Sequence, residues 1–170
     1  MEKYNDLLDT LLQEETNFQF LEFTNITAYQ IGSKIIEKAL RENKSIVVNI
    51  QKDGELLFYT RMNGTTVNND EWITRKNNTV HHFKHSSYYM HVYLKSINSN
   101  LEAHSLDQKD YVAEGGAFPL IIKNTGVVGT ITVSGLPGDE DHKMVTSVLN
   151  EMINVEITES SDAQVGARQH

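Results

Sequence analysis

The chain contains no cysteine, only two prolines and a single tryptophan among its 170 residues. The lack of cysteine excludes disulfides, thiolate-bound zinc, a cysteine-ligated iron–sulfur cluster and a thiol nucleophile. No uncharged apolar run reaches the roughly 20 residues that a membrane-spanning helix needs. The first nine residues are acidic and polar and do not resemble a secretory signal. We therefore expect a cytoplasmic protein that does not enter a membrane.

Positive charge is also scarce, because 23 acidic and 15 basic residues give a formal net charge of −8. Such an average field repels a polyanion, so nucleic-acid binding is not expected. Residues 61–95 depart from this average, since they hold five basic residues, two acidic residues and four of the seven histidines. A locally cationic, histidine-rich segment favours a small anionic ligand.

The pattern of hydrophobic residues predicts an α+β fold in one domain over residues 1–158. Alternating residues predict strands over 45–50, 56–60, 117–122 and 127–134. Amphipathic segments predict helices over 1–23, 27–41 and 71–83, from 86 or 87, and from 139 or 141. Paired strands between helical segments favour an antiparallel sheet over alternating βαβ units. The polar tail over 159–170 is expected to be disordered.

The helix predicted over residues 71–83 carries the most informative cluster. At 100° per residue, Trp72 and Phe83 fall on the apolar face together with Lys76. A lysine there either extends its ammonium to the rim, pairs with an acid, or serves a ligand or partner. Arg75 lies beside this face and is either an anion clamp or a solvated side chain.

Asp141 is the acid we consider as the structural partner of Lys76. Its neighbour His142 lies in the first turn of the last predicted helix, where an anion is attracted, although a half-buried histidine is the commoner outcome. His81 and His85 are four residues apart, a spacing that lets two imidazoles reach one metal. Surface histidines are the default there, and no metal site is predicted.

Two pairs of small residues border predicted strands. Gly115 and Gly116 precede one strand, and Ser134 and Gly135 end another. Glycines at such places allow close approach of a ligand or of a neighbouring backbone, and they also occur in plain turns. Both interpretations remain open.

Two blocks of sequence resemble the GlcG-like family, often labelled the haem-degrading domain. The family also includes haem-binding sensor-associated proteins and the C-terminal domain of a cobalamin adenosyltransferase. The matching strings lie at 69–76, 85–87, 115–120, 134–137 and 140–142, within a similarity that spans roughly residues 25–153.

This resemblance implies a profilin-like arrangement of α/β/α layers around the antiparallel sheet, and assembly into symmetric homo-oligomers. It also implies haem binding or degradation; no cofactor is established by the residues themselves, haem is implied by this resemblance alone, and we expect weak or no specific haem binding. Two positions depart from the family pattern: Glu114 replaces a histidine before the paired glycines, and His91 replaces a glycine. Haem iron needs a His, Tyr, Met or Cys ligand, so the first departure weakens the expectation of haem.

Three functions follow from these observations. The first is a homo-oligomeric, small-molecule-binding domain whose ligand is a tetrapyrrole or a small anion. The alternatives are an enzyme that degrades or processes haem, and an oligomeric scaffold that docks another protein. The sequence does not separate a pocket from a subunit interface and identifies no catalytic residue. The predicted ligand-binding residues are Trp72, Arg75, Lys76, His85, Ser86, Ser87, Gly115, Gly116, Ser134, Gly135, Asp141 and His142.

Overall fold

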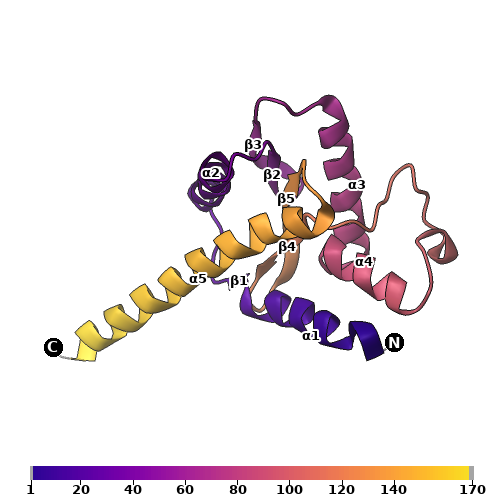
Figure 1. The fold of residues 1–170 in the computed structure, drawn as a ribbon. Helices are drawn as coiled ribbons and strands as arrows, with labels where there is room; N and C mark the ends of the chain where they lie inside the picture. The colour runs from indigo at the N-terminus through magenta and orange to yellow at the C-terminus, as the bar shows by residue number, and fades with distance from the viewer. Residues whose placement is uncertain (1, 169–170) are drawn as a thin grey trace.

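The computed structural model describes the backbone of residues 2–168 and the side chains of residues 3–154. Its helices and strands follow one another along the chain as Figure 1 shows. They are α1 (Glu2–Asn17), β1 (Gln19–Phe20), α2 (Asn25–Arg41), β2 (Val47–Lys52), β3 (Glu55–Arg61), α3 (Val67–Phe83), α4 (Ser87–Ser96), the short 3₁₀ helix η1 (Glu102–His104), β4 (Ala117–Ile122), β5 (Gly126–Ser134) and α5 (Gly138–Arg168).

The strands form one sheet in the order β1-β4-β5-β2-β3. Strands β4, β5, β2 and β3 pair antiparallel, and only the two-residue β1 pairs parallel, with β4. The predicted α+β fold with an antiparallel sheet is therefore confirmed. The helix predicted over residues 1–23 is too long, because α1 ends at Asn17 and Gln19–Phe20 form β1; two residues are too few to show a period of two.

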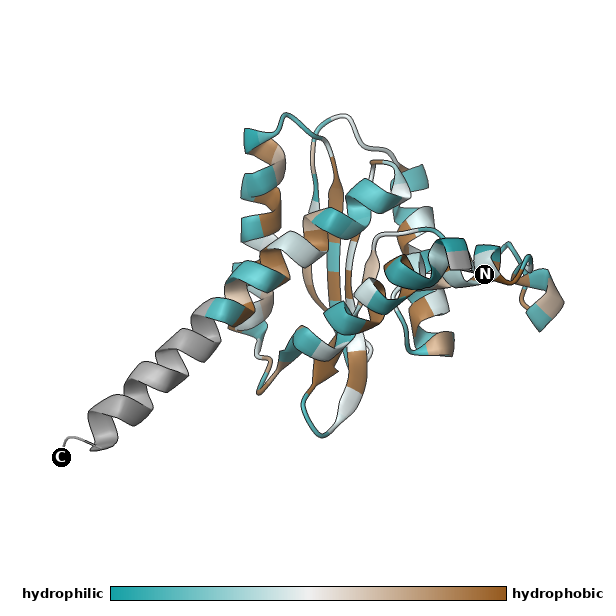
Figure 2. Ribbon diagram, turned by 60° about the horizontal axis from the view of Figure 1, so that its bottom comes forward, coloured by the Kyte–Doolittle hydropathy of each residue, from teal (hydrophilic) through white to brown (hydrophobic). Residues whose placement is uncertain are grey.

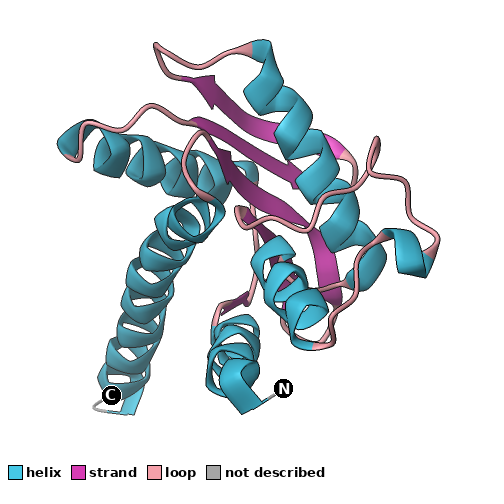
Figure 3. Ribbon diagram, turned by 45° about the vertical axis from the view of Figure 1, so that its right-hand side comes forward, coloured by secondary structure: helices cyan, strands magenta, loops and turns pink. Residues whose placement is uncertain are grey.

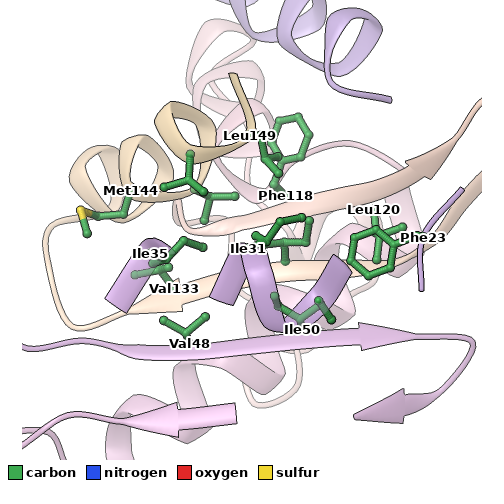
Figure 4. Close-up of a cluster of buried hydrophobic side chains, with 14 of the residues drawn as sticks. Phe23, Ile31, Ile35, Val48, Ile50, Phe118, Leu120, Val133, Met144 and Leu149 are labelled. Carbon is green, nitrogen blue, oxygen red and sulfur yellow. The ribbon is translucent and has the colours of Figure 1, made fainter. Parts of the chain in front are cut away.

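The two faces of the sheet are covered differently. Helices α2 and α5 pack on one face, and α3 and α4 lie on the other (Figures 1 and 3). The main hydrophobic core fills the space between the sheet, α2 and α5, where Ile31, Ile50, Phe118 and Leu149 are fully or almost fully buried (Figure 4). Figure 2 shows the hydrophobic residues gathered on the central strands.

The face beneath α3 contains more polar groups. Thr132 Oγ1 donates to Asn77 Oδ1, and both residues are buried, as are Thr130 of the same strand and Asn49 of the neighbouring β2. Alternation along β5 explains the contrast, because Ile131 and Val133 point to the apolar face while the threonines point to α3. Hydrogen bonds therefore hold α3 to the sheet alongside its apolar contacts.

Two helices begin earlier than the sequence predicted. Thr24, and not Thr27, is the N-cap of α2, and Thr27 is the residue whose backbone N–H donates to it. Thr66 precedes α3, and its backbone N–H donates to Asn69 Oδ1 at 2.9 Å. Because α3 starts at Val67, Asn69 is the third residue of its first turn and part of a capping box with Thr66, and it is not the N-cap.

The last helix, α5, runs to Arg168, whereas the sequence predicted a disordered tail over 159–170. Side chains from residue 155 onward and residues 169–170 lie outside the described residues, so disorder of the tail stays a prediction. Within the described residues, no helix has the length and apolar character needed to cross a membrane.

Candidate functional site

A buried ion pair lies at the base of the candidate site. Lys76 of α3 donates from Nζ to Asp141 Oδ2 at 3.0 Å and to the carbonyl oxygen of Val133 at 3.2 Å. Asp141, in the first turn of α5, also accepts a hydrogen bond from the backbone N–H of Leu136. The side chains of the pair are only 4% and 1% exposed. Of the alternatives considered for Lys76, the structure therefore shows pairing with an acid.

A cleft of about 300 Å³ opens beside this pair, between α3 and the turn that joins β5 to α5. It is lined by Asn69, Trp72, Lys76, Glu114, Ser134, Gly135, Leu136, Gly138 and Asp141. Five of the predicted site residues, Trp72, Lys76, Ser134, Gly135 and Asp141, therefore meet on one concave surface. Their role in binding a ligand stays a prediction.

The paired glycines let chain segments approach closely next to the ion pair. Gly116 has a φ of +136°, and a Cβ added there would lie 2.4 Å from the carbonyl oxygen of Val133 and 2.7 Å from Lys76 Nζ. At Gly115, an added Cβ would lie 2.2 Å from the carbonyl oxygen of Gly138. These glycines therefore permit close backbone packing that any side chain would obstruct.

Trp72 forms an aromatic part of the cleft wall. The guanidinium carbon of Arg75 lies 5.1 Å from the centre of the Trp72 ring, a cation–π arrangement. Arg75 is thus next to the cleft but is not among the residues that line it. Its Nε is buried and has no hydrogen-bond partner in the described part of the chain.

The charges in the cleft differ from the cationic patch that the sequence predicted. Burial raises the pKa of Asp141 to about 6, although the Lys76 ammonium opposes that shift. At neutral pH the carboxylate is mostly ionised and neutralises Lys76. Glu114 adds a negative charge to the wall. The expected free cation is therefore not present among the lining residues.

Two predicted histidines lie away from the cleft and bind α1. His85 Nδ1 lies 2.8 Å from Glu15 Oε1, and His142 Nε2 lies 2.8 Å from Glu14 Oε1. The hydrogen bond with Glu15 raises the pKa of His85, and burial opposes this shift. Both histidines therefore attach the first helix to the domain.

The predicted serines have local structural partners. Ser86 is the N-cap of α4, and its Oγ accepts from the backbone N–H of Tyr89 at 3.0 Å. Ser87 Oγ accepts from the backbone N–H of Ala117 at 3.0 Å and so ties α4 to β4. Neither serine lines the cleft.

Four residues line the cleft that the sequence did not assign to a site: Asn69, Glu114, Leu136 and Gly138. From the sequence, Asn69 or Asp70 is a candidate cap of the helix predicted over 71–83, and Glu114 is a departure from a family pattern. Leu136 and Gly138 belong to the Gly-Leu-Pro-Gly turn, so the position of that turn before the last helix was the available signal.

A larger hollow of about 540 Å³ lies between α1, α2 and α5. Its charged groups include Glu42, which pairs with Lys38 at 3.1 Å and with Lys44 at 3.3 Å on the surface. Because these charged groups pair with one another on the surface and remain partly exposed, we base the candidate site on the smaller cleft with its buried ion pair.

The single antiparallel sheet, its helical layers and the cleft at the end of β5 define a profilin-like α+β domain. A family model described as "Haem degrading protein HbpS-like" matches residues 23–150. The chain belongs to this family.

Relatives and solved structures agree with this assignment. The UPF0303 protein of Psychromonas ingrahamii is 42% identical over 148 residues, which cover 86% of this chain and 92% of that protein. The UPF0303 protein of Edwardsiella ictaluri is 41% identical over 151 residues, or 88% of this chain and 96% of that protein. The crystal structure of the Ybr137w protein superposes with a TM-score of 0.81 at 30% identity and covers 88% of this chain and 89% of that one.

More distant structures share the fold. The crystal structure of a PduOC:heme complex superposes with a TM-score of 0.61 at 20% identity, over 77% of this chain and 94% of that one. Haem iron takes a His, Tyr, Met or Cys ligand, and the cleft of this chain is lined by none of these residue types. The residues of the cleft therefore do not fit haem.

Proposed function

We propose that this chain is a small-molecule-binding subunit of a homo-oligomer, and that the cleft beside Lys76 and Asp141 is its ligand site. The observation that carries the proposal is the buried ion pair at the base of a concave surface. Desolvating two charges costs several kcal/mol, and such a pair is often no more stabilising than apolar side chains of the same size. The presence of this pair beside a cleft is therefore better explained by a role in binding a polar ligand than by a contribution to the stability of the fold.

The chemistry of the ligand follows from the lining. A tetrapyrrole is supported by the description of the family but not by the donor set of the cleft. A small anion was favoured by the sequence because of a free lysine, and that lysine is paired with Asp141. We therefore propose a small organic molecule with a flat body for the Trp72 wall. We also propose that the protein is located in the cytoplasm.

Assembly is supported by an apolar stripe on α2. Ile26, Tyr29 and Leu40 are 62–65% exposed and lie on the side of the helix away from its buried face. Exposed apolar patches of this kind mark contacts with other protein surfaces. The stripe faces away from the core, so it is available to another subunit.

The fluorescence of Trp72 tests the cleft directly, because it is the only tryptophan in the chain. We would screen a fragment library for compounds that change this fluorescence, and repeat the titrations with Leu136→Phe, which narrows the cleft. Leu56→Phe, at an exposed position on β3, is the matched control. We expect hits that bind the native protein and Leu56→Phe but lose affinity for Leu136→Phe. A library without such hits would contradict the proposed function.

A further inference from the structure

Glu114 is the acidic group of the cleft that lacks a close partner. Its side chain is 43% exposed and makes no hydrogen bond within the part of the chain that the structure describes. The basic side chain beside it is His91, whose Nδ1 lies 3.7 Å from Glu114 Oε2. The same Nδ1 lies 2.9 Å from the carbonyl oxygen of Ala113, a better distance for a hydrogen bond. The carboxylate of Glu114 is therefore available to a ligand.

Among the residues that line the cleft, the other features that attract an anion are already satisfied; Arg75, whose Nε has no hydrogen-bond partner in the described part of the chain, lies beside the cleft and does not line it. Lys76 gives hydrogen bonds to Asp141 and to a backbone carbonyl. The N-terminus of α5 carries three acids in its first turn, Asp139, Glu140 and Asp141, which offset the positive end of the helix dipole. The N–H of Leu136, in the preceding turn, is donated to Asp141. An anion entering the cleft would meet Glu114 without gaining a free donor from these groups.

Trp72 supplies a surface that suits a flat cation. The ring already holds the guanidinium of Arg75 at 5.1 Å, which shows that its electron-rich face attracts a delocalised positive charge here. Trp72 and Glu114 line the same cleft of about 300 Å³, so one small molecule can contact both.

We propose that the cleft selects a small planar cation of the amidinium or guanidinium class, which pairs with Glu114 and packs on Trp72. A planar fork of N–H donors matches the two oxygens of a carboxylate, which gives specificity over a compact ammonium. This inference rests on the proposed function of the cleft and names the class of its ligand.

Three molecules of nearly the same shape test the inference: benzamidine, benzamide and benzoate. Their affinities would be measured by Trp72 fluorescence and by calorimetry. We expect benzamidine to bind about tenfold more tightly than benzoate, the ratio that corresponds to about 1.4 kcal/mol, with benzamide between them. Glu114→Gln should remove this preference, and Glu114→Lys should reverse it. Glu71→Gln, at an exposed acid of α3, changes the net charge equally and should leave the preference intact.

Equal or tighter binding of benzoate to the native protein would overturn the inference, while a response of Trp72 sensitive to Leu136→Phe would still support the cleft as a site. No binding of benzamidine would also overturn it. The proposed function fails separately, if the fragment screen gives no ligand whose affinity depends on Leu136.

Discussion

Lys76 and Asp141 connect α3 to the start of α5, and each side chain is the main counter-charge of the other. Lys76→Met should lower the free energy of unfolding by about 3–5 kcal/mol, because it leaves the Asp141 carboxylate buried without its cation. Urea denaturation measures this change. Lys95→Met, at an exposed lysine of α4, should alter stability by about 0.5 kcal/mol or less.

The double variant Lys76→Met/Asp141→Leu separates a lost charge pair from lost packing. Removing both charges should recover most of the stability, because no unpaired group is left in the interior. If Lys76→Met is as stable as the native protein, the ion pair has no structural role and the base of the cleft is wrongly described.

Gly116 provides a second prediction about a single residue. Gly116→Ala should destabilise the protein by more than the roughly 1–2 kcal/mol that a positive φ costs, since the added Cβ would also overlap the Val133 carbonyl. Gly54→Ala is the control, because Gly54 has a φ of +79° and no atom within 4 Å of an added Cβ. Comparable melting temperatures for the two variants would contradict the close approach at Gly116.

Local patterns predicted part of the site well. The helical wheel placed Lys76 beside Trp72, and its pairing with Asp141 was one of the alternatives. By contrast, His85 and His142 bind Glu15 and Glu14, which lie 70 and 128 residues away in sequence. No local period encodes such contacts. The cationic patch over residues 61–95 stays a prediction, but its Lys76 is paired with Asp141, 65 residues away, and adding charges along a segment does not reveal such a pair.

At the level of the elements, α1 is held to the domain partly by histidine–carboxylate bonds. The pKa of His85 is raised above its usual 6.5 by the hydrogen bond with Glu15. The hydrogen bond between His85 and Glu15 therefore contributes fully to the stability of the fold below pH 6.5. That contribution is lost as the pH rises through the raised pKa of His85. Amide hydrogen exchange in α1, corrected for the intrinsic dependence on pH, should show weaker protection on the alkaline side. Glu15→Gln should weaken the dependence of this protection on pH. If the variant shows the same dependence on pH as the native protein, the proposed role of the His85–Glu15 contact is contradicted.

Strands β2, β3, β4 and β5 were predicted to within two residues at each end, because alternation or a short apolar run marks each of them, whereas the two-residue β1 was missed. The starts of α2 and α3 were missed, since several Thr and Asn residues compete as caps and only the folded backbone decides among them. Residues 96–112 gave no clear period, and there the structure has the end of α4, η1 and loops. Weak or absent periodicity therefore accounts for the elements that could not be assigned.

For the whole molecule, the apolar stripe on α2 leads to a prediction about assembly. Light scattering should give a mass well above the 19.3 kDa of one chain. Leu40→Glu should lower that mass, because it places a charge on the apolar stripe that would be buried in the contact. Ile97→Glu, at a 40% exposed residue after α4, is the control and should leave the mass unchanged. A monomer at micromolar concentration would contradict the proposal.

Haem binding can be tested on the same protein. We expect weak or non-specific binding, since the cleft offers no axial ligand and Glu114 stands at its wall. Absorption spectra at equimolar haem should show no sharp Soret shift. A sharp shift that disappears in a single His→Ala variant would show a haem site outside the cleft and would contradict this expectation.

The unequal faces of the sheet have a consequence for how the molecule opens. Apolar burial holds α2 and α5, whereas α3 depends in part on hydrogen bonds such as that between Asn77 and Thr132. Layers with less apolar burial open at lower free energy, so α3 should detach in partial unfolding before the opposite layer does. A ligand that touches Trp72 on α3 and Gly135 after β5 would join the weaker layer to the stronger one. Occupancy of the cleft would then be registered as a slower opening of α3, with no change in the shape of the folded domain.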